Sequence, residues 1–173
     1  MHKNLSVQTY TGKIVNLLNP DPQTFDIKDI AWSLAHQCRF NGHCTQFYSV
    51  AQHCIYCSMM CDKAYDALMH DAEEAYIGDL STPVKEVLGE SYQEMRNVIR
   101  EALALHFYYE PKDLEVVRVD QCMLATEKQQ IMVETDWDWN LPEKAYPDLQ
   151  IIECGPEDAY GWFLHRYETL REA

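Results

Sequence analysis

Positive charge is scarce in this 173-residue sequence: its 14 lysines and arginines face 28 aspartates and glutamates, and the formal net charge is −14. A protein that wraps DNA or docks on anionic lipid needs the opposite balance. We therefore expect neither a nucleic-acid polymer nor a membrane as a partner. A small phosphate compound is not excluded, because metal ions and a few local cations can reverse the field inside a pocket.

The sequence also lacks an apolar run near the length of a membrane span, and it begins without the basic and apolar regions of a signal peptide. Its seven cysteines are an odd number without the spacing of a small disulfide scaffold. We therefore expect reduced thiols and a cytoplasmic protein. Repeats, low-complexity segments and linkers are absent, and the length suits one domain over residues 1–173.

Helical periodicity dominates what is present. Asp26 is a predicted N-cap with Asp29 at N3, and an apolar stripe follows. Residues 7–18 carry β-branched and aromatic residues on both sides of Thr11-Gly12, which predicts a short hairpin. The expected fold class is all-α with a small N-terminal β-hairpin. The predicted helices cover residues 26–37, 46–60, 64–77, 91–106, a segment opening at Pro111, and 156–170, while 38–45, 80–84 and 134–155 are expected to be irregular.

The stretch ALMHDAEEAYIGDLSTPVK, residues 67–85, concentrates groups that bind metals. His70 and Asp71 are adjacent at the edge of an apolar face, and Glu74 lies one helical turn after His70, so its carboxylate points the same way. Asp79 follows a glycine that ends the helix. This set suits Zn, Mn, Co or Fe and the activation of water. An ordinary His-Asp hydrogen bond is the commoner explanation of the dipeptide alone.

Two more residues complete a ligand pattern. His53 lies 17 residues before His70, on the preceding helix of a helical hairpin. Asp120 lies on a later helix among apolar neighbours, where a carboxylate is costly unless it is paired or bound to a metal. His43 competes with His53 but sits in a glycine-containing loop. Cys54, Cys57 and Cys61 form an apolar stripe on one helix, so we expect buried free thiols rather than a zinc site.

The resulting H…HD…D pattern resembles that of the HD-domain metal-dependent phosphohydrolases. Three segments carry the likeness: YSVAQH at 48–53, LMHDAEEAYIGDLSTPVK at 68–85 and VDQCMLATE at 119–127. The CRFNGH segment and the AYGWFLHRYETL helix are similar to phage- and prophage-encoded HD hydrolases, which include phage dATP triphosphohydrolases. Small HD-domain 5′-deoxynucleotidases are also similar. The likeness spans about residues 9–170 and implies an HD-domain helical bundle that forms a homo-oligomer.

The resemblance also implies a role for each matching position. Arg39 falls where the nucleotidases place a phosphate-binding arginine, but Phe40 replaces their neighbouring tryptophan, so base stacking is left open. No ion-pair partner for Arg39 is evident in its loop. The implied metal ligands are His53, His70, Asp71 and Asp120, for Zn, Co or Mn; the implied catalytic residues are Glu74 and Asp79; the implied substrate-binding residues are Arg39, His43 and Lys85.

The chemistry agrees with these roles. A divalent metal neutralises phosphoryl charge and activates water, a carboxylate accepts its proton, and an arginine clamps phosphate oxygens. We expect a deoxynucleotide phosphohydrolase. The first hypothesis is a dNTP triphosphohydrolase, with dATP as a candidate for its preferred substrate. A dNMP 5′-nucleotidase is the alternative within the same chemistry, and a non-catalytic nucleotide sensor with a structural metal is the alternative outside it. If the gene is phage-encoded, its product acts in the bacterial host cytoplasm.

Overall fold

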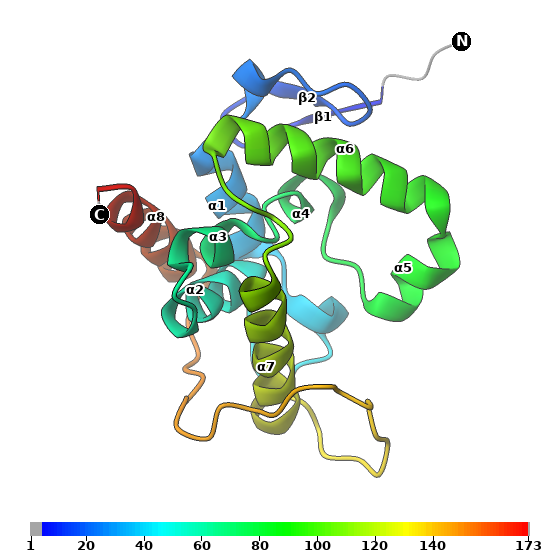
Figure 1. Cartoon of the computed structure of the whole chain (residues 1–173), viewed down its shortest axis with the longest axis vertical. Helices are drawn as coiled ribbons and strands as arrows, with labels where there is room; N and C mark the ends of the chain where they lie inside the picture. Colours follow the sequence, from blue (N-terminus) through cyan, green and yellow to red (C-terminus); the bar gives the residue numbers. More distant parts are fainter. Residues whose placement is uncertain (1–4, 173) are drawn as a thin grey trace.

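Helices make up most of the chain, and the computed structural model describes residues 5–172 (Figure 1). The predicted all-α fold with a small N-terminal β-hairpin is confirmed. The helices are α1 Ile27–His36, α2 Val50–Met60, α3 Ala64–Met69, α4 Glu74–Ile77, α5 Thr82–Leu88, α6 Glu90–Phe107, α7 Leu114–Ile131 and α8 Pro156–Glu172, with 3-10 helices η1 Pro22–Thr24 and η2 Arg39–Gly42.

The N-terminal hairpin pairs β1, Ser6–Gln8, with β2, Ile14–Asn16, in antiparallel register. Gly12 lies in the connecting turn with φ of 85°, a left-handed conformation that glycine adopts without a steric penalty. Thr11 ties the hairpin to α1, because its backbone N–H and its hydroxyl donate to the Asp29 carboxylate at 2.6 and 2.8 Å. Asp29 therefore anchors the hairpin.

Local capping signals start the two helices that flank the site. Asp26 caps α1 as predicted, and its side chain accepts a hydrogen bond from the Lys28 backbone N–H at 3.0 Å. Ser49 and Gln52 form a reciprocal capping box at the start of α2. This box makes α2 begin at Val50, four residues later than the predicted start.

The predicted continuous helix over residues 64–77 is wrong, because the chain breaks between α3 and α4. Across the break, the backbone N–H of Ala72 donates to Met69 and that of Glu74 to Asp71, both at 3.0 Å. These bonds span three residues instead of four, so residues 70–73 form tight turns. Gly78, with φ of 84°, ends α4 as expected.

The predicted irregular segment around Pro83 is helical instead. It forms α5, in which Pro83 lies in the first turn, a position that needs no backbone N–H. Gly89 ends α5 with φ of 66° and lets α6 begin at once. Residues 132–155 contain no helix or strand, in line with the irregular segment expected there.

Helix α2 occupies the centre of the fold and packs against α1, α3, α7 and α8 (Figure 1). The largest buried cluster joins α1, α2, α3, α6 and α8 through Ile30, Leu34, Ala51, Leu68, Leu103 and Phe163. A second cluster joins α2 and α3 to α7 and includes Cys57, Ala67, Val119 and Met123. Across residues 5–172, no helix combines the length and apolar character that crossing a membrane requires.

Candidate metal centre

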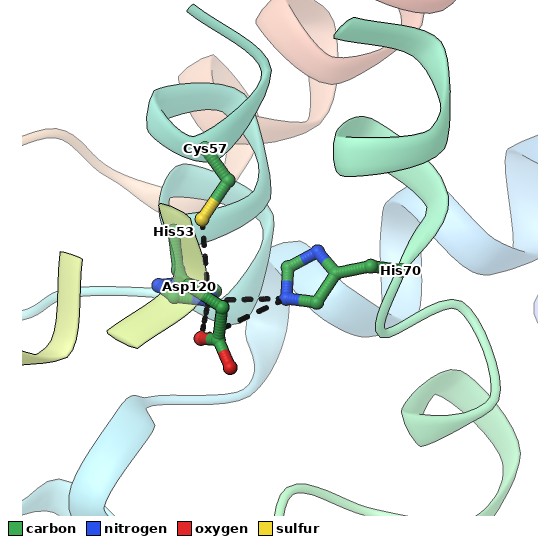
Figure 2. A group of neighbouring side chains, drawn as sticks. All are labelled: His53, Cys57, His70 and Asp120. Atoms are coloured by element: carbon green, nitrogen blue, oxygen red, sulfur yellow. Dashed lines mark hydrogen bonds and ion pairs between the residues drawn. The ribbon is translucent and has the colours of Figure 1, made fainter. Parts of the chain in front are cut away.

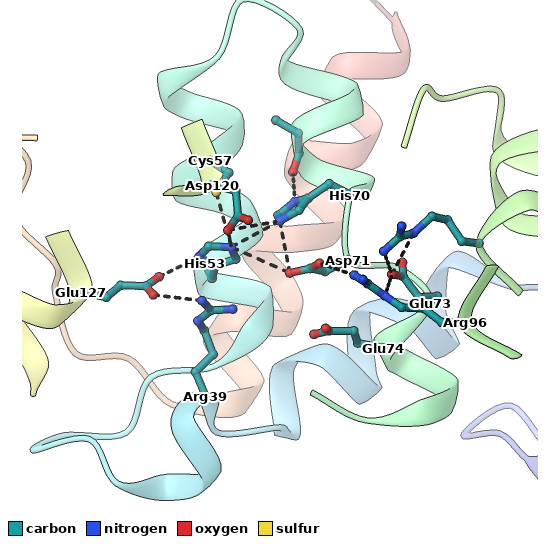
Figure 3. A network of polar contacts seen from close by, with 12 residues as sticks. Arg39, His53, Cys57, His70, Asp71, Glu73, Glu74, Arg96, Asp120 and Glu127 are labelled. Carbon is teal, nitrogen blue, oxygen red and sulfur yellow. Dashed lines mark hydrogen bonds and ion pairs between the residues drawn. The ribbon is translucent and has the colours of Figure 1, made fainter. Parts of the chain in front are cut away.

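Three of the residues predicted to bind a metal, His53, His70 and Asp120, place their donor atoms within 4.8 Å of one another, and Asp71 adjoins them through His70. His53 comes from α2, His70 and Asp71 from the turn after α3, and Asp120 from α7 (Figures 2 and 3). The Nε2 atoms of His53 and His70 lie 3.3 Å apart. Asp120 Oδ1 is 3.1 Å from His53 Nε2, and Asp71 Oδ2 is 3.1 Å from His70 Nε2. The structure thus brings all four donors together, and their role as ligands stays a prediction.

His70 turns its Nε2 atom toward the other donor atoms. Its Nδ1 lies 2.7 Å from the backbone oxygen of Ala67, which can only accept, so Nδ1 carries the hydrogen. A neutral His70 then has a free lone pair at Nε2. Burial opposes protonation of His70, but Asp71 and Cys54 together outweigh it and hold the pKa of His70 well above its ordinary value, so a metal has to displace a proton from Nε2. The cluster of donor atoms around His70 therefore stabilises positive charge, as a bound cation requires.

His53 is oriented by a carboxylate that the sequence analysis missed. Its Nδ1 lies 2.6 Å from Glu127 Oε1, so Nε2 faces the cluster (Figure 3). Burial would raise the pKa of Glu127, but Arg39 and His53 outweigh it and lower that pKa, so Glu127 is ionised. A signal was present: Glu127 follows Asp120 by seven residues, which puts both on one face of α7.

Arg39 has an ion-pair partner that the sequence did not make evident. Arg39 begins η2 instead of lying in an open loop, and its side chain is buried. One of its terminal nitrogens lies 3.0 Å from Glu127 Oε2. Sequence inspection missed this pair because 88 residues separate its members. Its Nε is buried without a hydrogen-bond partner among the described residues, and its binding of phosphate stays a prediction.

Asp120 marks the open side of the centre. Among its apolar neighbours Asp120 is paired with His53, and its side chain is 41% exposed while that of His53 is fully buried. The reason is its position on the outer edge of α7, next to Val117, which is also exposed. A ligand can therefore approach from the Asp120 side, whereas Glu127 and α2 close the opposite side.

The two predicted catalytic acids lie beside the cluster. Glu74 begins α4, is only 2% exposed, and has one oxygen 2.9 Å from Lys85 Nζ, while the other has no partner among residues 5–172. Burial, then the charges of Asp71 and Asp79, raises the pKa of Glu74 from 4.5 to about 8. Asp79 is half-buried, and its backbone N–H donates to Gln37.

The predicted substrate cations differ in position. Lys85, in α5, reaches the site through its ion pair with Glu74. His43 is exposed at the C-cap of η2, and within the described chain its imidazole makes no recorded hydrogen bond. The structure therefore brings Arg39 and Lys85, but not His43, into the polar network of the centre.

No protein-family model matches the chain. Its sequence is 35% identical over 171 residues to an Escherichia coli protein named "Uncharacterized protein YfdR", and the match covers 96% of each chain. The chain belongs to the YfdR family. A Rhodobacter capsulatus protein, also named only as uncharacterized, is 36% identical over 108 residues, which are 56% of this chain and 55% of that protein.

The donor set of this YfdR-family chain fits one divalent ion. Two histidine nitrogens bound tetrahedrally to zinc at ~2.0–2.1 Å lie about 3.3–3.4 Å apart. The observed separation of the two Nε2 atoms, 3.3 Å, agrees with that value. Borderline nitrogen donors with carboxylate oxygens suit zinc, cobalt or manganese. The buried cluster of histidine, aspartate and cysteine can therefore hold a metal ion, whose identity the geometry does not select.

Proposed function

We propose that this chain is a metal-dependent hydrolase of deoxynucleotide phosphates, and first of all a dNTP triphosphohydrolase. The observation that carries the proposal is the convergence of His53, His70, Asp71 and Asp120 beside a buried acid, Glu74, with a raised pKa. The resemblance to HD-domain phosphohydrolases supports it. A metal bound by these residues would neutralise phosphoryl charge and lower the pKa of a bound water.

Glu74 is the proposed proton acceptor. A general base works best when its pKa lies near the operating pH, and the pKa of Glu74 is raised to about 8. Its second oxygen has no partner among the described residues, so it is free to accept a hydrogen bond from water. Asp79 stands close enough for its charge to raise the pKa of Glu74, and it is the alternative acceptor.

The phosphates meet positive charge on two sides. Lys85 forms an ion pair with Glu74. Arg39 lies beside His53, with Glu127 contacting both (Figure 3). Because one Arg39 nitrogen is committed to Glu127, only the rest of its guanidinium is available to phosphate. Three phosphates need more cations than one, and Arg39, Lys85 and the exposed His43 supply them in this proposal. The alternative, a dNMP 5′-nucleotidase, needs fewer cations because its substrate carries one phosphate.

An aromatic surface beside Arg39 is the proposed place of the base. The rings of Phe40 and Trp139 lie 5.8 Å apart, and those of Trp139 and Trp137 6.2 Å apart. Trp137 is 70% exposed, and Lys128 lies over the Trp139 ring. Stacking on such rings is tolerant of the base, so adenine preference needs further contacts.

Product analysis tests the proposal. Protein stripped of metal and reloaded with Zn, Co or Mn is incubated with all dNTPs, dNMPs and NTPs, and products are separated by chromatography. Inorganic triphosphate from a dNTP identifies the triphosphohydrolase, and phosphate from a dNMP the nucleotidase. Asp71→Ala is the control, which we expect to lose metal and turnover with its fold intact. Nucleotide binding without turnover would instead indicate a sensor, and full metal occupancy in Asp71→Ala would refute the ligand set.

A further inference from the structure

A cysteine lies against the same donor atoms. Cys57 follows His53 by one turn of α2, is fully buried, and places its sulfur 3.6 Å from His53 Nε2 (Figure 2). The donor atoms of His53, Cys57, His70 and Asp120 all lie within 4.8 Å of one another. The expected buried free thiol in an apolar stripe is confirmed, because Cys57 packs in the second apolar cluster, and its sulfur also points at the donor atoms.

The distances fit two ligands of one ion. A tetrahedral zinc with Zn–N of ~2.0–2.1 Å and Zn–S of ~2.3 Å separates nitrogen and sulfur by about 3.6 Å. The observed separation between Cys57 Sγ and His53 Nε2 is 3.6 Å. The two histidine nitrogens meet the corresponding criterion at 3.3 Å. Two of the three donor separations thus match one tetrahedral ion, and the third, between Cys57 and His70, lies within 4.8 Å.

We propose that Cys57 is a thiolate ligand of this metal centre and that it makes the centre prefer zinc or cobalt over manganese. The proposal rests on the metal centre of the proposed function and adds a donor to it. When the sulfur binds, its S–H bond breaks, the proton leaves to solvent, and the sulfur lone pair forms the metal bond. Soft thiolate ligands favour zinc, whereas manganese favours oxygen ligands.

Two other cysteines provide comparisons: Cys54 within α2 and Cys61 at its C-cap. Cys54 is equally buried and lies near His70 and Asp71, but it does not share the group that contains His53 and Asp120. Cys61 is one turn beyond Cys57, packs in the same apolar cluster, and belongs to neither donor group. Cys54 is thus the rival ligand, and Cys61 is the matched control.

Absorption spectroscopy of the cobalt-loaded protein tests the thiolate. Bound sulfur gives a near-ultraviolet charge-transfer band to Co(II), which nitrogen and oxygen donors do not give. We expect the band in the wild type and in Cys61→Ala, and we expect its loss in Cys57→Ala at equal cobalt content. A wild type that binds cobalt without the band, or a band that survives Cys57→Ala and vanishes in Cys54→Ala, would overturn the proposal. Cys57→Ser preserves the volume should the alanine variant fold poorly.

Metal competition tests the selectivity. Metal-free protein is equilibrated with equal concentrations of Zn²⁺ and Mn²⁺, and the bound metals are counted by elemental analysis. We expect Cys57→Ala to shift the bound ratio toward manganese by at least about tenfold, the usual scale for losing a contact that tunes a metal ligand. Cys61→Ala should keep the wild-type ratio. An unchanged ratio in Cys57→Ala would overturn the claim.

The outcomes separate this inference from the proposed function. A charge-transfer band without turnover of any nucleotide supports the thiolate ligand and refutes the hydrolase. Turnover by a cobalt-loaded protein that lacks the band supports the hydrolase and refutes the thiolate ligand.

Discussion

Two buried glutamate–arginine clusters flank the metal centre, and they do different things. Glu127 on α7 joins Arg39 to His53 and contacts a predicted ligand directly at 2.6 Å. Glu73, in the turn before α4, accepts from Arg96 and Arg100 of α6 through one oxygen and contacts none of the four predicted ligands. The first cluster orients a ligand, whereas the second ties the ligand-bearing turn to α6.

The two clusters therefore differ in whether their carboxylate acts mainly on metal affinity or mainly on folding stability. A carboxylate that contacts a metal-binding histidine changes the basicity of its nitrogen and thereby the affinity for the metal. A carboxylate that neutralises the buried Arg100 and the half-buried Arg96 mainly prevents uncompensated charge. Arg96 also comes within 4.0 Å of Asp71, so the Glu73 cluster reaches the centre only through a long contact.

Removing Glu73 is expected to have the largest effect on stability. Glu73→Ala leaves Arg96 and Arg100 without their carboxylate, and breaking such a buried pair costs about 3–5 kcal/mol. Urea unfolding measures the loss, and zinc affinity of the folded fraction should stay at the wild-type value. The control is Glu101→Ala, which changes an exposed residue of α6, the helix that carries Arg96 and Arg100. Its free energy of unfolding should stay within ~0.5 kcal/mol of the wild-type value. A loss no greater than the control would contradict the assigned role.

Glu74 is a third buried glutamate, and its partner is a lysine instead of an arginine. Unlike Glu73 and Glu127, it is predicted to act directly in catalysis. Glu74→Gln keeps shape and volume but cannot accept a proton, so turnover should fall by about a hundredfold or more while metal and nucleotide still bind. Steady-state kinetics and metal analysis of one preparation measure this. Loss of metal in this variant would indicate that Glu74 is a metal ligand. Full activity would indicate that Asp79 accepts the proton.

The same variant gives a pH-dependent readout in metal-free protein. Because the folded-state pKa of Glu74 is raised from 4.5 to about 8, the folded chain keeps a proton that the unfolded chain loses in this window. Stability from this group is therefore present below about pH 4.5 and falls as the pH rises to about 8. The free energy of unfolding, wild type minus Glu74→Gln, should decrease across that window. A difference that is constant with pH would contradict the raised pKa.

The effect of removing Glu127 on metal affinity should be smaller than that of removing Glu74 on turnover, and because Glu127 also pairs with the buried Arg39, its loss should destabilise the fold as well. Glu127→Gln removes the charge behind His53, so zinc affinity should fall by about 10–100-fold. Competition with a chelator measures it. Unfolding of the metal-free variant indicates how much of the effect is structural. If Glu73→Ala weakened metal binding as much as Glu127→Gln does, the distinction between the two clusters would collapse.

Much of the fold followed from local signals. The cap at Asp26, the Thr11-Gly12 turn and helical periodicity predicted the hairpin and most helices, because each depends on residues within a few positions. The four predicted ligands could also be named from the sequence, because the H…HD…D pattern is defined by the order and spacing of residues along the chain. One local signal was overlooked: Pro83 in a first turn and Gly89 beyond it mark the ends of α5.

What the sequence by itself determined was therefore the all-α class, the hairpin and most helices, and which residues offer donor atoms to a metal. Tertiary structure alone decided that Arg39 pairs with Glu127, 88 residues away, and that the helix over 64–77 breaks at His70. It also turned the Cys57 sulfur toward His53 and left Asp120 open to solvent. The physical reason is that capping and periodicity act within one or two turns, whereas the partner and exposure of a side chain depend on how distant helices pack.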